Sequence, residues 1–424
     1  MPNRNTHSAD LHPIFSDLDS IARQSGLIRR RSHKFSARGF LFSLLQCVTQ
    51  GTSSMNHLVL QLANWEPLSM TRQALHQRFS AASSEFLVRV LTHLLSPADR
   101  PDSRSFFRRI LIEDSTVISM ANSNADHFPN NGNGKLATAG GKIDLVTDYL
   151  TGHAIDISLH DARDPDQAIA FDLLENIGKN DLLLRDRGYF SIDVLEEVER
   201  REAFWVSRLP ASIRAFDGEA VSLESLLRES SSDQIDIEIY LGRHRAHRCR
   251  LVATRLSRAE TEKNRRQRRR DSKRHGATAS KKGLLHDGWS LILTNLPEED
   301  FDAKEIYRLY SIRWSIEIEF RAMKQSSHLH HAINHRSSFF HLEAMLMALM
   351  IRTVLVHDLG ARLRRKVSGK TEISIEKLSD AFSVYLTRQH RETAMRPFEF
   401  DPRHIQTEKR KRLSLYAATA QSLA

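Results

Sequence analysis

The chain has 424 residues, of which 40% are hydrophobic and 27% charged, and its formal net charge is +10. This length can bury a sizeable core divided into two or three domains. Two cysteines, Cys47 and Cys249, exclude a disulfide framework and a cysteine-based zinc site. The N-terminus has no apolar stretch of the kind found in secretory signals, and the apolar run from 345 to 356 is interrupted by Arg352 and too short for a membrane span. We therefore expect a cytoplasmic protein without a membrane segment.

The first hundred residues predict a helical N-terminal region. Apolar residues recur at helical spacing from 35 to 96, without strand-like alternation, whereas residues 1–33 are polar and basic and are expected to be poorly ordered. Residues 53–62 and 69–79 predict a helix pair. The second of these, with Arg72 and Arg78, is a candidate recognition helix for DNA, although a plain helical bundle has the same spacing.

After a Pro- and Ser-containing linker at 97–105, the pattern changes to strands and helices in alternation. A Gly- and Asn-rich loop at 122–141 separates the first strand from a hairpin, whose turn contains Gly152. The sequence thus predicts a β-β-β-α-β-α-β order. Its members are strands 107–119, 142–149 and 153–160, helix 165–177, strand 181–186, helix 191–202 and strand 203–209.

Two aspartates stand in apolar runs of this region. Asp114 lies in the middle of the first strand, and Asp186 follows the strand that starts at 181. An unpaired carboxylate is costly to bury, so both need a partner. A divalent cation such as Mg²⁺, which prefers oxygen ligands, is a natural one. Glu113 is a poor candidate because neighbouring side chains on a strand point to opposite faces.

Residues 210–298 interrupt the alternation with β-like runs around a basic segment. Between 263 and 282 there are ten lysines and arginines, Arg268, Arg269 and Arg270 among them, and a single acidic residue, Asp271. Such a density of like charge is typical of a solvated loop or of an arm that contacts phosphates and orders on DNA.

The segment from Asp302 to Lys324 predicts a helix that starts with a capping box. At 100° per residue Tyr310, Arg313, Glu317 and Lys324 fall within roughly 60° on one face. Glu319 lies roughly 160° from Glu317 and is a poor candidate for the same site. Asp114, Asp186 and Glu317 together predict a site for two divalent ions that promotes in-line displacement at phosphorus.

These motifs resemble those of a known family. The spacing Tyr310-x2-Arg313-x3-Glu317-x6-Lys324 is similar to the YREK signature of DDE transposases from bacterial insertion sequences. Asp-Arg-Gly-Tyr, from Asp186 to Tyr189, resembles the second-aspartate motif of that family, and Glu-Asp-Ser-Thr, from 113 to 116, resembles the first.

The resemblance implies an α/β fold: an RNase H-like catalytic domain interrupted by an inserted β-subdomain, with a helical N-terminal DNA-binding region and a helical C-terminal region. We expect the catalytic domain at 106–209 and 299–336 and the inserted β-subdomain at 210–298. The N-terminal region is expected at 1–100 and the C-terminal region at 337–424. It also implies metal-dependent cleavage at the element's ends and strand transfer into target DNA, with two Mg²⁺ or Mn²⁺ ions and a homodimer that pairs two terminal inverted repeats. A nucleoid-associated bacterial protein is expected.

DNA-contacting residues also follow from the resemblance. Tyr310, Arg313 and Lys324 would contact the DNA backbone near the cut. Trp289, in the inserted region, would stack on a flipped base if hairpins form, although a strand tryptophan is as often a core residue. Further candidates for DNA contacts are Trp314, Arg187, Arg72 and Arg78 of the helix pair, and Arg268, Arg269 and Arg270 of the basic segment.

Two alternatives remain open at this level: a DNA-binding repressor that no longer cuts, and a nuclease without strand transfer. Four histidines at 328, 330, 331 and 335 do not have the spacing of a zinc site.

Overall fold

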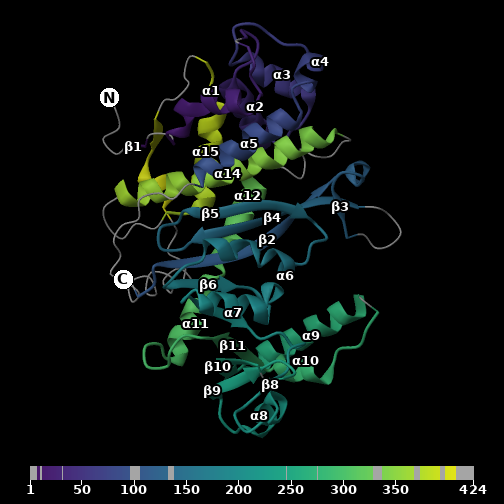
Figure 1. Ribbon diagram of the computed structural model, residues 1–424, viewed down its shortest axis with the longest axis vertical. Coiled ribbons are helices and arrows are strands. Elements are labelled where there is room, and N and C mark those ends of the chain that lie inside the picture. The colour runs from purple at the N-terminus through teal and green to yellow at the C-terminus, as the bar shows by residue number, and fades with distance from the viewer. Residues whose placement is uncertain are drawn as a thin grey trace. The chain divides into compact units, whose positions relative to one another are not determined.

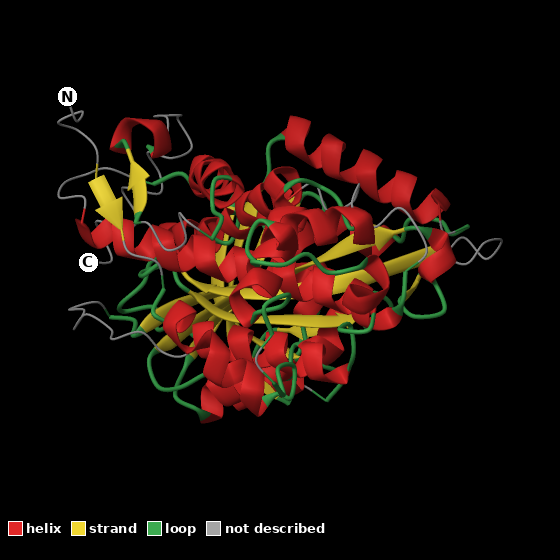
Figure 2. Cartoon of the chain, turned by 90° about the horizontal axis from the view of Figure 1, so that it is seen from above, coloured by secondary structure: helices red, strands yellow, loops and turns green. Residues whose placement is uncertain are grey.

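The computed structural model describes residues 7–9, 12–30, 32–95, 106–131, 138–244, 246–274, 276–327, 337–366, 373–391 and 397–406 (Figures 1 and 2). The chain is mixed α/β and divides into two compact units. Unit 1 comprises residues 1–102, 114–164 and 315–410, and unit 2 comprises 103–113, 165–314 and 411–424. The predicted linker at 97–105 and the four histidines lie outside the described residues.

Helices make up most of unit 1. Serine or threonine side chains cap several of them, as Ser36, Ser54 and Thr71 do at the starts of α2, α3 and α4. The helix α1 was not anticipated, because its surroundings in the sequence are polar, yet Phe15 and Leu18 are buried. The helices are α1 (Ile14–Gln24), α2 (Ala37–Thr49), α3 (Met55–Ala63), α4 (Arg72–His76), α5 (Ala81–Leu94), α12 (Ser315–Ser327), α14 (Phe339–Lys366), α15 (Ile375–Thr387) and α16 (Pro402–Ile405).

The long helix α14 forms the centre of unit 1. By length and composition it is the one helix of the described residues that could cross a membrane, but 83% of its most apolar stretch is buried inside the protein. Arg352 does not end the apolar run, as the sequence had suggested. It is buried, and it donates hydrogen bonds to Thr49 Oγ1 (3.3 Å), the Ser379 carbonyl (3.0 Å) and Ser383 Oγ (2.7 Å). These acceptors on α2 and α15 satisfy the buried cation.

Unit 1 also contains a sheet in the order β3-β4-β2, with β5 paired antiparallel to β4. Its strands are β3 (Pro129–Asn130), β4 (Thr138–Asp148), β5 (Ala154–Asp161) and the second half of β2 (Arg109–Met120). Strand β4 begins within the segment predicted as a loop. The predicted hairpin turn is present, and Gly152 takes a φ of 76° that favours glycine. Separately, β1 (His7–Ala9) pairs with β12 (Phe398–Phe400).

Unit 2 has the strand order β2-β6-β7-β11-β10-β9-β8. The first half of β2 pairs parallel with β6, and β6 pairs parallel with β7. The remaining strands pair antiparallel and come from the predicted inserted region. The strands are β6 (Asp181–Arg185), β7 (Phe204–Arg208), β8 (Ala215–Phe216), β9 (Gln234–Leu241), β10 (His247–Arg255) and β11 (Trp289–Thr294).

The helices of unit 2 largely follow the predicted order. The predicted helix 165–177 is instead the short α6 (Asp166–Ile169) followed by a 3₁₀ turn (Asp172–Asn176). The basic segment, expected as a loop or arm, is mostly helical, because α9 (Arg258–Arg274) and α10 (Lys281–His286) cover it. The others are α7 (Ile192–Arg200), α8 (Leu223–Glu229) and α11 (Ala303–Ile312).

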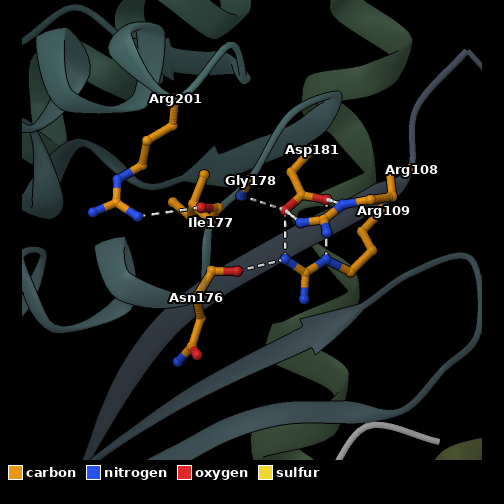
Figure 3. A network of polar contacts seen from close by, with 7 residues as sticks. All are labelled: Arg108, Arg109, Asn176, Ile177, Gly178, Asp181 and Arg201. Carbon is orange, nitrogen blue, oxygen red and sulfur yellow. Dashed lines mark hydrogen bonds and ion pairs between the residues drawn. The ribbon is translucent and has the colours of Figure 1, made fainter.

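An ion-pair network fixes the start of the parallel strands in unit 2 (Figure 3). Arg109 and Asp181 are register partners at the first positions of β2 and β6. Asp181 accepts hydrogen bonds from Arg109 Nε (3.0 Å), Arg108 Nε (2.8 Å) and the Gly178 backbone (3.0 Å), while Arg109 also reaches the carbonyl of Asn176 (2.6 Å). This register continues to Glu113 and Arg185, each of which precedes a predicted metal-binding aspartate in the chain.

Candidate active site

Asp186 lies directly after β6, at the start of a 3₁₀ turn (Arg187–Tyr189), as predicted. Its side chain is 45% exposed, which leaves the carboxylate accessible to a ligand. The hydroxyl of Tyr310 donates a hydrogen bond to Asp186 Oδ1 at 3.4 Å, and Arg313 Nη2 lies 4.0 Å from the same oxygen. Unit 2 therefore brings together the second aspartate and two of the four YREK residues.

Two guanidinium groups lie close to the ring of Tyr310. The Cζ atom of Arg313 is 5.8 Å from the centre of its ring, and that of Arg208 is 5.6 Å away, both within cation–π range. Burial raises the pKa of Tyr310 to about 12, so the phenol stays protonated and acts as a donor at neutral pH.

Arg208 was missed in the sequence. It ends β7, where it reads as an ordinary solvent-exposed strand residue. The only available signal was that it ends the strand next to β6, the strand that leads to Asp186.

Asp114 and Glu113 point to different environments on β2, as the strand alternation predicted. Glu113 is buried and forms an ion pair with Arg185, whose Nη2 also donates to the Ala170 carbonyl at 2.9 Å. Asp114 is partly exposed, and the backbone N–H of Ser115 donates to its Oδ1 at 2.8 Å. Glu113 is thereby committed to a structural pair, which leaves Asp114 as the stronger candidate of the two.

The predicted single helix through 310–324 is wrong. Helix α11 ends at Ile312 and α12 begins at Ser315. The backbone N–H groups of Arg313 and Trp314 bond to carbonyls three residues back, at 3.2 Å each, so a tight turn separates the helices. The segment has no proline or glycine to reveal this break. Tyr310 therefore belongs to α11, Arg313 to the turn, and Glu317 and Lys324 to α12, so wheel angles for one continuous helix do not apply across the turn.

On α12, Glu317 lies in the first turn and Lys324 in the last. Both are partly exposed, and burial lowers the pKa of Lys324. The apolar side chains of this segment, Ile312, Ile316, Phe320 and Met323, are all buried. The capping box that starts α11 is also confirmed, because Asp302 and Glu305 exchange hydrogen bonds of 2.8 Å.

Glu319 faces the interior of unit 1, beside Thr147 and with Oε2 3.8 Å from His357 Nε2. Burial raises the pKa of Glu319 to about 8 and lowers the pKa of His357 to about 4. At neutral pH both side chains are therefore neutral, and their contact is not an ion pair. A buried, protonated acid is a poor ligand for a divalent cation.

The two tryptophans have opposite environments. Trp289 is buried, with the guanidinium of Arg255 4.2 Å from its ring centre. Trp314 is 45% exposed. Trp289 is only 5% exposed, so a base could stack on it only after a local rearrangement, whereas the Trp314 ring is accessible to solvent.

The predicted DNA-contacting arginines are not equivalent either. Arg72 and Arg187 are exposed, as are Arg269 and Arg270. The guanidinium of Arg78 packs on the Phe35 ring, 4.9 Å from its centre. Arg268 forms a bidentate ion pair with Asp287, with both N···O distances 2.7 Å.

The donor set suits a hard divalent cation, because carboxylate oxygens are the ligands that Mg²⁺ and Mn²⁺ prefer. Asp186 fits this use, since its carboxylate is half exposed. Across the residues that the structure describes, no group of three or more His, Cys, Asp and Glu side chains is close enough to hold an ion. Asp114 and Glu317 belong to unit 1 and Asp186 to unit 2.

Comparison with known proteins decides the class. Residues 105–354, more than half of the chain, match the family model described as the transposase DDE domain. The chain belongs to this family. It is thus a DNA transposase, a DDE enzyme of the bacterial insertion-sequence type that acts on DNA and depends on a divalent metal ion.

Relatives match along most of this transposase. Those for the insertion sequence elements IS231B and IS231C of Bacillus thuringiensis subsp. berliner are 26% and 27% identical, over 86% of this chain and 81% of theirs. The transposase for IS1151 of Clostridium perfringens is 23% identical over 73% of this chain and 71% of its own. A solved piggyBac transposase synaptic complex with hairpin DNA aligns with 97% of this chain and 83% of that one, at 11% identity and a TM-score of 0.48. The family resemblance drawn from the motifs is confirmed.

Proposed function

We propose that this transposase cuts DNA at the terminal inverted repeats of its element and joins the freed ends to target DNA, with Asp114, Asp186 and Glu317 as ligands of two Mg²⁺ or Mn²⁺ ions. The observation that carries the proposal is the cluster in unit 2, where a half-exposed aspartate lies beside Tyr310 and Arg313. The proposal requires Asp114 and Glu317 of unit 1 to share these ions with Asp186.

An RNase H-like catalytic domain supports this assignment. Apart from the two-residue β3, the chain order β2, β4, β5, α6, β6, α7, β7 follows the predicted β-β-β-α-β-α-β order. The pairing directions agree with it, because β4 and β5 are antiparallel whereas β6 is parallel to both β2 and β7. In such a domain Asp114 lies on β2, the strand next to both β4 and β6. Strands β8 to β11 form the inserted β-subdomain.

The ions, when bound, would activate a water or hydroxyl nucleophile and stabilise charge on the attacking and leaving oxygens. The chain's own residues then position the phosphodiester. Arg313 and Lys324 bind its non-bridging oxygens, and Tyr310 orients the Asp186 carboxylate through its hydroxyl. Hydrolysis frees a 3′-OH, which attacks either the opposite strand, forming a hairpin, or target DNA.

The remaining DNA contacts follow the motifs. Arg72 of α4 and Arg78, just after that helix, would recognise the terminal repeat, while the exposed Arg187, Arg269 and Arg270 would contact backbone phosphates. Trp314 or Trp289 would stack on an unpaired base if a hairpin forms. Two copies of the chain would pair two element ends, as a homodimer in the bacterial cytoplasm, associated with the nucleoid.

A cleavage assay with two matched variants tests the site. The substrate is duplex DNA bearing the element's own ends, with Mg²⁺ or Mn²⁺. Glu317→Gln should lower the cleavage rate by about a thousandfold or more, because a lost ion ligand costs several kcal/mol in the barrier. It should leave end binding unchanged. Glu319→Gln makes the same chemical change two residues away and should still cleave.

Cleavage by Glu317→Gln at the wild-type rate would refute the assignment of Glu317. Separation of the products on a denaturing gel distinguishes hairpin ends from open ends. Binding to the ends without any cleavage by the wild type, with either metal, would instead indicate a repressor.

A further inference from the structure

Helix α9 is a 17-residue helix without a single buried residue, although it is part of unit 2 and lies alongside α10 (Figure 1). Its sequence contains almost no large apolar side chain, so the hydrophobic effect does not hold it in place. Polar contacts attach one face, and the rest of the helix remains in water.

The attached face consists of Arg268 and of the residues three and four positions before it, which share its side of the helix. Asn264 Nδ2 donates to the Asp287 carbonyl at 3.3 Å, and Arg265 Nε donates to the Leu284 carbonyl at 3.1 Å. Arg268 grips the Asp287 carboxylate through Nε and Nη2, at 2.7 Å each. This bidentate pair is 25% exposed at the arginine and 9% exposed at the aspartate, so it is partly shielded from water.

The outward face carries Lys263, Arg266, Arg270 and Lys273, all exposed. At 100° per residue these four fall within about 80°, on the side opposite Arg268. Glu262 lies 3.5 Å from Arg266 and takes up part of its charge. The four cations form a straight stripe about 15 Å long, and a duplex segment of that length carries about nine phosphates.

We propose that this outward face is a second DNA-binding surface, separate from the catalytic carboxylates, which contacts the phosphates of duplex DNA without reading sequence. Arg268 and Asp287 are positioning residues that hold the stripe in place, so Arg268 is not a DNA contact. The proposal rests on the proposed function in taking DNA as the partner. An apolar protein partner is excluded as the occupant because the stripe offers no apolar side chain to bury.

The test measures fluorescence anisotropy of the full-length protein on duplex DNA of unrelated sequence, with EDTA present so that cleavage does not intervene. The stripe variant changes all four cations to glutamine. The slope of log affinity against log salt should become shallower by about 3.6, at 0.9 for each phosphate contact. The advantage in affinity of the wild type over the variant should therefore shrink about a hundredfold between 50 and 200 mM salt.

The matched control removes four exposed cations elsewhere: Arg89, Lys179, Arg200 and Arg248 also become glutamine. The net charge changes equally, yet affinity and slope should change little. An unchanged slope in the stripe variant overturns the proposal. An equal loss in the control overturns it too, because the effect would then arise from total charge.

A second pair of variants tests the positioning role at constant charge. Arg248→Lys loosens an exposed ion pair with Glu238, outside α9, and should keep wild-type affinity, whereas Arg268→Lys loses the bidentate grip on Asp287 and should weaken binding several-fold. Equal behaviour of the two lysine variants would overturn the role of Arg268. Because these measurements need neither metal nor cleavage, they are independent of whether Asp114, Asp186 and Glu317 are the ion ligands.

Discussion

Tyr310 shows how a single residue combines several interactions at the candidate site. The guanidinium groups of Arg208 and Arg313 both lie within 6 Å of its ring centre, and its hydroxyl contacts Asp186. Because burial raises the pKa of Tyr310, its phenol keeps its proton at neutral pH and can donate it in a hydrogen bond to Asp186. The two arginines bring positive charge to the position where the DNA backbone would approach Asp186.

Arg208 is therefore expected to contact DNA. Arg208→Gln should reduce the slope of log affinity against log salt by about one, the change expected when one phosphate contact is lost. The measurement is a salt titration of binding to end DNA without metal. Arg228→Gln, at an exposed arginine of α8, is the control and should leave the slope unchanged. A slope identical to the wild type in both variants would rule out the contact.

At the scale of elements, the network around Asp181 aligns β2 with β6 (Figure 3). Burial of Asp181 opposes its ionisation, but hydrogen bonds from Arg109, Arg108 and Gly178 outweigh it and hold the pKa of the carboxyl below its usual value. Its contribution to stability is therefore complete above the unfolded pKa and is lost as the pH falls through the lower folded pKa.

Asp181→Asn should destabilise the protein strongly, because Arg109 remains buried without its counter-charge. Breaking one partner of a buried pair typically costs about 3–5 kcal/mol. Urea unfolding at pH 7 measures the loss. Glu202→Gln removes the exposed ion pair with Lys179 and should cost about 1 kcal/mol or less. Equal losses in the two variants would contradict the role of burial.

The helix α12 has a different dependence on pH. The folded pKa of Glu319, about 8, lies above its ordinary value of 4.5, so the folded protein binds the extra proton between these values. Stability from this group is present at low pH and decreases as the pH rises towards 8. The protonation of His357 differs between the folded and unfolded states only below about pH 6.5. Between pH 6.5 and 8 the pH dependence of stability therefore comes from Glu319 and not from His357.

We expect the wild type to lose up to a few kcal/mol of unfolding free energy between pH 6.5 and 8, and Glu319→Gln to lose much less. Thermal or urea unfolding at both pH values, in the same salt, measures the difference. If the variant keeps the full pH dependence of the wild type, another group must cause it.

At the scale of the whole molecule, DNA binding and DNA cleavage should depend on different groups. The positive charge that attracts DNA lies on lysine and arginine side chains, whereas the chemistry depends on carboxylates and ions. Chelation with EDTA should abolish cleavage but leave binding to end DNA nearly unchanged, and added Mg²⁺ should restore cleavage. Gel-shift and cleavage assays on the same samples test this. Loss of binding on chelation would mean that the ions organise the DNA-binding surface as well.

The local sequence predicted most elements of the transposase. Strands β2, β6 and β7, the β4–β5 hairpin and the capping box at Asp302 could be read from alternation, apolar runs and turn residues. The break at Arg313 and Trp314 could not, because no proline or glycine marks it and the local apolar pattern continues through it. The helical state of the basic segment was also hidden, because Asp287, which anchors Arg268, lies 19 residues away in the chain.

By itself, the sequence determined the family and the candidate residues, because spacing along the chain and residue type suffice for both. Only the tertiary structure decided which charged side chains are committed to partners: Glu113 to Arg185, Arg268 to Asp287 and Arg352 to three acceptors on α2 and α15. The physical reason is that burial and hydrogen bonding join residues far apart in sequence. They set which acids are ionised and which cations remain available to DNA.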